Sequence, residues 1–108
     1  MSYEIHVVRT QSWIDAQSDP ISKAEISQVV ANDPELTWSE TDWVNESDEK
    51  GGLIRNYMVA WNGVSRFLWQ NGELVCSGAD QESITKLVEI AGKLNARVVG
   101  DEDEEYFQ

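Results

Sequence analysis

Apolar and polar positions alternate at the start of the chain. In the run YEIHVVR, residues 3–9, Ile5 and Val7 fall on one side while His6 falls on the other, which is the two-residue period of a β-strand. His6 is expected to be half-exposed on this strand. The next run, TQSWIDAQSDP, mixes turn-forming residues with Trp13, so we expect a loop whose large apolar side chains pack against the body.

The pattern then changes to that of a helix. Ser22 and Glu25 have the spacing of a capping box, and an apolar stripe follows until Pro34, which disfavours helix in the residue before it. The stripe consists of Ala24, Ile26, Val29 and Val30. Beyond this short helix, LTWSETDWV (36–44) predicts a strand and a turn, and NESDEKGG (45–52) predicts a charged loop.

Two Asn-Gly pairs, at residues 62–63 and 71–72, separate three strand-like runs in LIRNYMVAWNGVSRFLWQNGELVCSG. Asn-Gly between such runs is the strongest short-range signal for a two-residue type I′ hairpin. We therefore expect a three-stranded antiparallel meander. Its register predicts four opposing pairs: Trp61 with Val64, Tyr57 with Leu68, Gln70 with Glu73, and Trp69 with Leu74.

Side-chain alternation gives this meander two unlike faces. One face carries no charge and is expected to meet the core. It consists of Met58, Ala60, Phe67, Trp69, Leu74 and Cys76. The opposite face mixes aromatic, aliphatic and charged groups and is expected to be partly exposed. It consists of Arg55, Tyr57, Val59, Trp61, Val64, Arg66, Leu68, Gln70, Glu73 and Val75.

The clearest helix runs from the N-cap Asp80 to Asn95, which suits the left-handed residue that ends a helix. Its apolar stripe is expected to cover the uncharged sheet face, and it consists of Ile84, Leu87, Val88, Ala91 and Leu94. ARVVG then predicts a short last strand, and DEDEEYFQ (101–108) an acidic tail. Together the elements predict a single α+β domain over residues 1–108, with an antiparallel sheet of four to six strands and two helices packed mainly on one face.

Charge narrows the range of partners. Twenty acidic and eight basic side chains give a formal net charge of -12, and the basic residues are scattered, so no nucleic-acid-binding surface is expected. A strongly acidic surface suits a basic protein partner, although acidity also simply keeps a small protein soluble. The single cysteine, the lack of a basic-then-apolar leader and the lack of a long apolar run favour a cytoplasmic protein without a membrane partner.

The chain carries no catalytic motif. His6 is the only histidine, so no Ser-His or Cys-His pair is predicted from a motif, and Cys76 on the expected core face acts as an apolar group. Gly51 and Gly52 lack the strand, helix and lysine of a phosphate-binding loop. We therefore expect a non-enzymatic protein with no catalytic residue and no cofactor.

Five consecutive carboxylates, residues 101–105, offer oxygen ligands suited to a hard cation. The run lacks the alternating acidic spacing and the central glycine of a calcium loop. A solvated acidic tail is therefore expected instead of a metal site, and weak cation binding stays an alternative.

Aromatic side chains within an acidic rim are typical of protein interfaces. Trp43 lies among carboxylates between Glu40 and Glu49, and Tyr106 follows the acidic run. Each aromatic residue is either an interface anchor or part of the core, and the sequence leaves both possibilities open. The candidate partner-binding residues are Glu40, Asp42, Trp43, Tyr57, Trp61, Arg66, Leu68, Asp101, Glu102, Glu105 and Tyr106.

The segment ITKLVEIAGKLNARVVGDEDEEY, residues 84–106, resembles the C-terminal signature of a group of small bacterial α+β proteins, and FLWQNGEL resembles the stretch that precedes their helix. The resemblance covers roughly residues 53–106. Asp103 departs from it, standing where a glycine is usual in the terminal turn, and AEISQ lacks a tryptophan often found in the first helix. Some proteins of this group are toxin-immunity proteins, so the resemblance implies a fold and, by association, that role.

The leading hypothesis is therefore a protein-binding module, and more specifically an immunity protein that neutralises a basic toxin. The alternative from another class is a homodimeric structural or accessory protein that associates through the mixed face of the meander. That alternative places Trp61 and Leu68 in the dimer interface.

Overall fold

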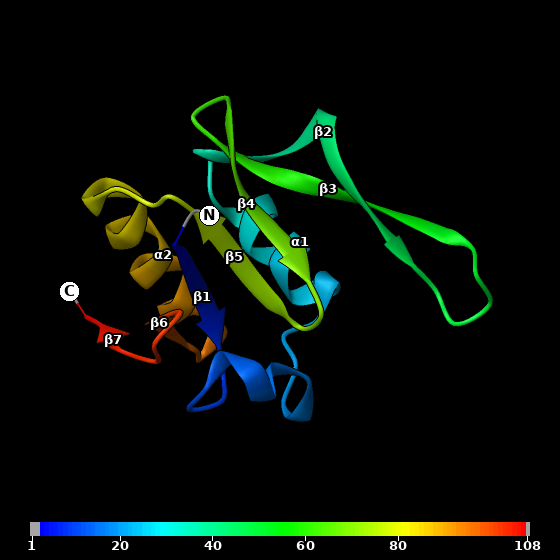
Figure 1. The fold of residues 1–108 in the computed structure, drawn as a ribbon. Coiled ribbons are helices and arrows are strands. Elements are labelled where there is room, and N and C mark those ends of the chain that lie inside the picture. The colour runs from blue at the N-terminus through cyan, green and yellow to red at the C-terminus, as the bar shows by residue number, and fades with distance from the viewer. Residues whose placement is uncertain (1–2, 108) are drawn as a thin grey trace.

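Seven antiparallel strands in the order β2-β3-β4-β5-β1-β6-β7 form the sheet, and the computed structural model describes residues 3–107 (Figure 1). The strands are β1 (Glu4–Val8), β2 (Leu36–Ser47), β3 (Leu53–Trp61), β4 (Val64–Gln70), β5 (Glu73–Ser77), β6 (Arg97–Gly100) and β7 (Glu105–Tyr106). The helices are α1 (Lys23–Asn32), α2 (Gln81–Leu94) and the short 3₁₀ helix η1 (Trp13–Ser18). The predicted α+β class is confirmed, with one strand more than the expected four to six.

The predicted helix ends are confirmed by their hydrogen bonds. Ser22 and Glu25 form a reciprocal capping box at the start of α1, with each side chain accepting from the backbone N–H of the other. Asp80 accepts from the N–H of Ser83 at 2.8 Å at the start of α2. Asn95 ends α2 in the left-handed conformation, with a φ of 54°.

Both Asn-Gly pairs form tight turns with positive φ at each residue, as a type I′ turn requires. The predicted pairs of Trp61 with Val64, Trp69 with Leu74 and Gln70 with Glu73 are confirmed. The pair of Tyr57 with Leu68 is wrong, because β4 contains one extra residue next to β3. Val59 lies opposite Phe67 and Ala60 lies opposite Ser65, which leaves Arg66 without a counterpart on β3.

This irregularity reverses the predicted faces of β3. Val59 is fully buried in the main core, and Trp61 packs against the same core with its ring stacked on Phe67 at 6.4 Å. Trp61 therefore lies on the helix side of the sheet, whereas the sequence placed it on the opposite face. Phe67, Leu74 and Cys76 are buried on the core side as predicted.

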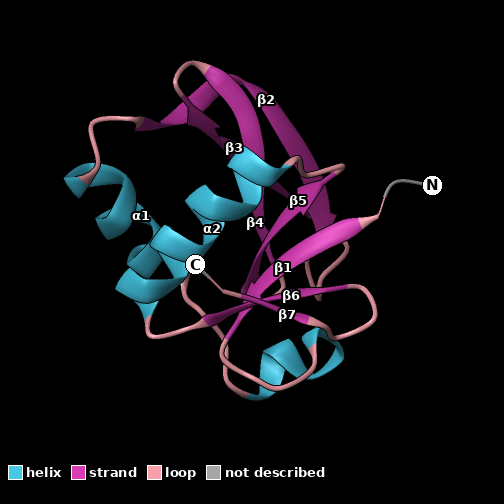
Figure 2. Cartoon of the chain, turned by 90° about the vertical axis from the view of Figure 1, so that its left-hand side faces the viewer, coloured by secondary structure: helices cyan, strands magenta, loops and turns pink. Residues whose placement is uncertain are grey.

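The core lies between the sheet and the two main helices. Figure 2 shows α1 and α2 on one side of the sheet. Leu87 and Ile90 of α2 belong to the same buried cluster as Ile5 and Val7 of β1. The opposite side of β1 is covered locally by η1, through a small cluster of Val8, Ala16 and Val99 with Trp13 beside it. The segment predicted as a loop thus contains a 3₁₀ helix, which starts at the N-cap Ser12.

Strand β4 divides the sheet into two parts. Its first half pairs with β3 up to Phe67, and its second half, from Leu68, pairs with β5. The hairpin of β2 and β3 therefore leaves the body of the sheet, and Figure 1 shows it projecting beyond the helices. We call residues 40–57 of this hairpin the arm. The loop predicted at residues 45–52 is partly wrong, because β2 continues to Ser47, which pairs with Leu53.

No helix in the described part of the chain is long and apolar enough to cross a membrane.

Candidate protein-binding surface

The arm begins at an irregularity in β2. Trp38 pairs with Val59 and Trp43 pairs with Tyr57, so four residues of β2 face the single Met58 between these pairs. The Ser39 hydroxyl accepts from the N–H of Asp42 at 2.9 Å, which satisfies a backbone donor inside the bulge. The bulge keeps both tryptophans on one face, because their partners on β3 are two residues apart.

Three side chains at the base of the arm form an ordered aromatic and cationic cluster. The Trp43 and Tyr57 rings lie 5.9 Å apart, and the Arg55 guanidinium lies 4.1 Å from the centre of the Trp43 ring. Arg55 also donates to the Tyr57 hydroxyl at 3.4 Å. Trp43 is nevertheless 41% exposed. It is therefore a surface residue held in place by neighbours, and it is no part of the core.

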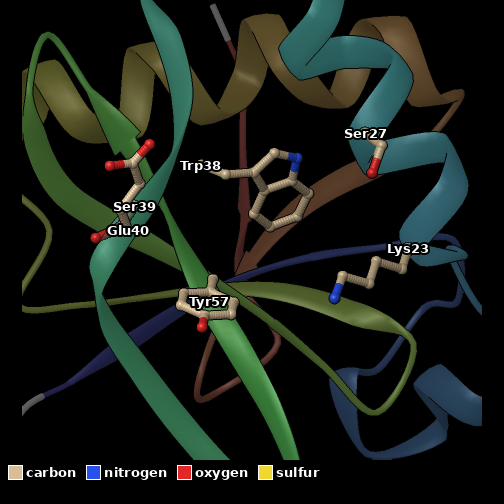
Figure 3. Close-up of a pocket in the computed structure, with 6 residues that line it drawn as sticks. All are labelled: Lys23, Ser27, Trp38, Ser39, Glu40 and Tyr57. Carbon is tan, nitrogen blue, oxygen red and sulfur yellow. The ribbon is translucent and has the colours of Figure 1, made fainter.

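A pocket of about 440 Å³ opens between the arm and α1. Figure 3 shows Trp38 and Tyr57 from the hairpin opposite Lys23 and Ser27 from α1. The Lys23 ammonium lies 5.6 Å from the centre of the Trp38 ring. The pocket therefore combines aromatic walls with polar groups, which is a composition suited to receiving one side chain of a partner.

Apolar side chains are exposed along the rest of the arm. Leu53 is 71% exposed and Ile54 is 47% exposed, and both follow the turn that joins β2 to β3. Val44 is also exposed on β2. Single exposed apolar residues are common on soluble proteins, but several on one projecting hairpin make that hairpin a candidate contact surface.

The same arm carries five carboxylates and only two basic side chains. The carboxylates are Glu40, Asp42, Glu46, Asp48 and Glu49, and the basic residues are Lys50 and Arg55. Three of the carboxylates accept hydrogen bonds, two from within the hairpin and one from β4. Asp42 accepts from the Ser65 hydroxyl at 2.6 Å, Glu46 from the Asn56 amide at 2.8 Å, and Asp48 from the N–H of Gly52 at 2.7 Å. The predicted residues Glu40, Asp42, Trp43 and Tyr57 thus lie together.

The other predicted residues of the meander do not form one surface with them. Trp61 lies on the helix side and donates towards Glu35, whereas Leu68 pairs with Val75 and lies on the opposite side of the sheet. Arg66 is exposed at the irregularity in β4. The prediction that Trp61 and Leu68 share one face is therefore wrong, and the homodimer alternative itself stays a prediction.

The acidic C-terminal segment is ordered against the sheet. Tyr106 pairs with Val98 and packs against the main core, and Glu105 lies 3.7 Å from Arg97. Glu102 is exposed in the turn before β7. Residues 102–105 are exposed, as expected for a solvated acidic segment, whereas Asp101 and Tyr106 are partly buried, and Tyr106 holds the end of the chain in place.

The Asp101 side chain contacts His6. The exposure of this histidine is the property that the sequence predicted least well. His6 is only 2% exposed, because η1 covers its side of β1 and the Trp13 ring stacks on the imidazole at 4.6 Å. Its Nδ1 contacts Glu73, and its Nε2 lies 2.8 Å from Asp101. The expectation of a half-exposed histidine is wrong, because alternation along a strand does not reveal what covers the second face.

The two carboxylates favour the protonated imidazole. Burial lowers the pKa of His6, but hydrogen bonds to Glu73 and Asp101 outweigh burial and raise it above the ordinary value. The bond to His6 in turn lowers the pKa of Asp101. Asp101 also accepts from the backbone N–H of Glu4 at 2.8 Å. The cluster thus ties the C-terminal segment to β1 and β5.

Glu4, His6 and Asp101 also offer three metal-ligand atoms within 4.8 Å of one another. Both ring nitrogens of His6 already face carboxylates, and Glu4 accepts from the Ser77 hydroxyl at 3.1 Å. These hydrogen bonds explain why the three ligand atoms lie close together: His6 is an ion-paired histidine.

A second buried charge cluster joins α2 to the end of α1. Lys86 is only 4% exposed, and its ammonium lies 2.8 Å from Asp33 and 2.7 Å from Glu35. Glu89 completes the cluster at 3.2 Å. Burial lowers the pKa of Lys86, but the bonds to Asp33 and Glu35 outweigh it and raise the pKa well above the usual range. This cluster joins α2 to the segment between α1 and β2, and Glu35, Lys86 and Glu89 also line a pocket of about 320 Å³.

Comparisons with protein-family models, with curated proteins and with solved structures found no match for this chain.

Proposed function

We propose that this chain is a non-enzymatic protein-binding module that engages a basic partner protein through its arm. The observation that carries the proposal is the composition of that hairpin, where exposed Trp43, Leu53 and Ile54 lie among five carboxylates. Aromatic and aliphatic anchors supply most of the affinity in protein interfaces, while surrounding charges steer the approach and select the partner.

Two further features support this proposal. Trp43 is held between Arg55 and Tyr57, so little side-chain entropy remains to be lost when a partner contacts it. The formal net charge of -12 attracts a basic protein over long distances and accelerates its approach.

Residues 84–106 resemble a group of small bacterial proteins, some of which are toxin-immunity proteins, and this resemblance suggests a more specific role. We propose that the arm occludes the basic groove of a toxin, with its carboxylates standing where that groove would bind phosphate groups. Glu40 and Asp42 lie within three residues of Trp43 in the sequence, so charge and anchor would reach such a groove together.

Co-purification from the cell of origin tests the proposal. The wild-type chain is expected to retain a basic protein that elutes as salt is raised, because salt screens the attraction between opposite charges. A Trp43→Ala/Leu53→Ala variant is expected to lose this partner. A matched Val64→Ala/Phe107→Ala variant removes two exposed apolar residues outside the arm and should retain it. Recovery of the chain alone at every salt concentration, or equal retention by both variants, would contradict the proposal.

A further inference from the structure

Strand β3 has an open edge along most of its length. β2 pairs with it on one side from Leu53 to Trp61, but on the other side β4 pairs only with residues 59–61. β4 then turns to β5, and Figure 1 shows β3 and β4 diverging. Residues 53–58 therefore present one row of backbone groups that the sheet does not use.

The hairpin geometry identifies these backbone groups. Asp48 donates its N–H to the carbonyl of Gly52 at 2.9 Å, which fixes the alternation of hydrogen-bonded pairs along the antiparallel hairpin. The groups of Ile54 and Asn56 then point towards β2. Those of Leu53, Arg55 and Tyr57 point to the open edge, and the same alternation directs Val59 towards its partner on β4.

The open edge lacks the protection that natural edge strands usually carry. The sequence LIRNYM (53–58) contains no proline and a single charged residue, Arg55, whose guanidinium lies over the Trp43 ring. Edge strands normally avoid unwanted pairing through charges, prolines or a covering element. An exposed edge without these features is a surface suited to pairing with another strand.

A groove of about 570 Å³ runs beside this edge. One wall comes from the arm, with Glu46, Ile54 and Asn56, and the facing wall comes from Trp69 and the β4–β5 turn. The segment from Pro20 to Lys23, which leads into α1, also lines it. The groove is therefore mainly apolar inside, with Lys23 and Glu46 as its charged residues.

We infer that an extended segment of the basic partner lies in this groove and adds a strand to the open edge of β3. This inference rests on the proposed function. Backbone pairing would satisfy the edge groups of Leu53, Arg55 and Tyr57, and six residues of strand span roughly 20 Å. Alternate side chains of the segment would face the apolar groove and the acidic surroundings, so a segment that alternates apolar and basic residues fits best.

Charge favours such a partner over a second copy of this chain. Pairing two β3 edges would bring together two arms, and each arm has five carboxylates and only two basic residues. Like charges brought close together across an interface oppose binding, whereas a basic segment neutralises the same carboxylates.

A synthetic peptide of alternating lysine and valine, Lys-Val-Lys-Val-Lys-Val-Lys, serves as the probe. Titration into the ¹⁵N-labelled full chain is expected to shift the amide resonances of the arm and to slow hydrogen exchange at Leu53, Arg55 and Tyr57. A peptide of the same sequence with every backbone amide methylated keeps the charge but cannot donate hydrogen bonds. It is expected to bind more weakly and to give no protection.

A pair of variants tests the edge from the side of this chain. Leu53→Pro removes one N–H from the open edge, where proline is tolerated, whereas Leu53→Ala removes the side chain and keeps the N–H. Affinity for the lysine-valine peptide is expected to be about fivefold lower in the proline variant than in the alanine variant, since one hydrogen bond contributes about 1 kcal/mol.

Two results would overturn the inference. Absence of peptide binding at millimolar concentration would show that the groove does not accept a strand. Equal binding of the methylated peptide would show attraction by charge alone, and the proposed function would then stand without backbone pairing. Failure of the proposed function itself appears separately, as loss of the basic partner in co-purification.

Discussion

Lys86 shows how one side chain joins two helices within a very acidic protein. Its ammonium contacts Asp33, which is itself buried and accepts a hydrogen bond from the backbone N–H of Glu35. A buried ion pair contributes little compared with an apolar pair, but removal of one partner leaves an uncompensated charge. The cluster is therefore a sensitive point of the fold.

We predict that Lys86→Met lowers the free energy of unfolding by about 3 to 5 kcal/mol, because the Asp33 carboxylate loses its main partner. Lys93→Met is the matched control, since Lys93 is exposed and lies 3.7 Å from the same carboxylate. Its effect is expected to stay below about 1 kcal/mol. Urea unfolding measures both values, and equal losses would contradict this account of the cluster.

His6 predicts a dependence of stability on pH. Its pKa in the folded state lies above the ordinary value of 6.5, so its contribution is fully present below that pH and is lost as pH rises through the folded pKa. The loss amounts to about 1.4 kcal/mol for each unit of difference. The pKa of Asp101 is lowered, so its contribution is lost as pH falls through the folded pKa.

Urea unfolding at a series of pH values is expected to show the loss above pH 6.5 in the wild type and a flatter profile in His6→Gln. The chain has one histidine, so its imidazole NMR signal reports the same titration directly. A midpoint at or below 6.5 would contradict protonation of His6 between two carboxylates.

The two Asn-Gly turns differ in what surrounds them. A side chain at Gly63 would meet open space, whereas a Cβ at Gly72 would lie 2.7 Å from Pro20. Gly72 also accepts from the N–H of Ile21 through its carbonyl at 2.9 Å. The β4–β5 turn therefore fixes the segment that leads into α1, whereas the β3–β4 turn contacts the chain through Asn62, whose N–H donates to the carbonyl of Glu35 at 2.8 Å.

We predict that Gly63→Ala costs roughly 1 to 2 kcal/mol, because its φ of 84° is strained for a residue with a Cβ. Gly72→Ala has a similar φ of 80° and is expected to cost about 1 to 3 kcal/mol more, because the added methyl group is overpacked. Thermal or urea unfolding of both variants gives the difference. Equal costs would show that the turn does not pack on Pro20.

The sequence predicts helix ends and turns well, but it predicts less well which face of the sheet each strand residue lies on. Capping residues and Asn-Gly turns act within a few positions, so α1, α2 and both turns could be predicted from Ser22, Asp80, Asn95 and their neighbours. The extra residue Arg66 in β4 leaves no local signal, yet it moved Trp61 to the core side. Contacts between distant segments were equally hidden, as the pairing of His6 with Asp101 shows.

Asp103 stands where a glycine is usual in the group of proteins that the chain resembles, and the structure explains this difference. Its φ of 64° is the left-handed conformation that favours glycine, and aspartate is among the residues that tolerate it. The carboxylate accepts from the N–H of Trp13 at 3.3 Å and from the Ser12 hydroxyl at 3.1 Å. The terminal turn thus gains contacts to η1 that glycine could not make.

The charge of the whole molecule affects its stability as well as its partners. The chain has twenty acidic and only eight basic side chains, so the excess negative charges repel one another in the folded state. Salt screens this repulsion. The buried Lys86 and His6 clusters are screened much less, so they are expected to persist at high salt.

We predict that the melting temperature rises as sodium chloride is increased from about 10 mM to 200 mM, where the Debye length falls from about 30 Å to less than 10 Å. A Glu40→Gln/Glu49→Gln variant, which removes two exposed charges of the arm, should show a smaller rise. Calorimetry in sodium and potassium chloride separates screening from specific ion binding. A fall in the melting temperature would contradict net repulsion.

Only part of the exposed surface of the arm could be predicted from the sequence. Glu40, Asp42, Trp43 and Tyr57 were predicted as partner-binding residues from composition, and the structure brings them onto one hairpin. Leu53 and Ile54 were missed, because they looked like an ordinary strand beginning. Their exposure depends on where β4 leaves β3, which no local pattern reports.

Site-specific photo-crosslinking in the cell of origin tests whether the arm contacts a basic protein. A photoreactive phenylalanine derivative in place of Leu53 probes the arm, and the same group in place of Phe107 probes an exposed position outside it. A crosslink is expected from position 53 to a basic protein, and none is expected from position 107. No crosslink from position 53, or equal crosslinks from both positions, would contradict binding through the arm.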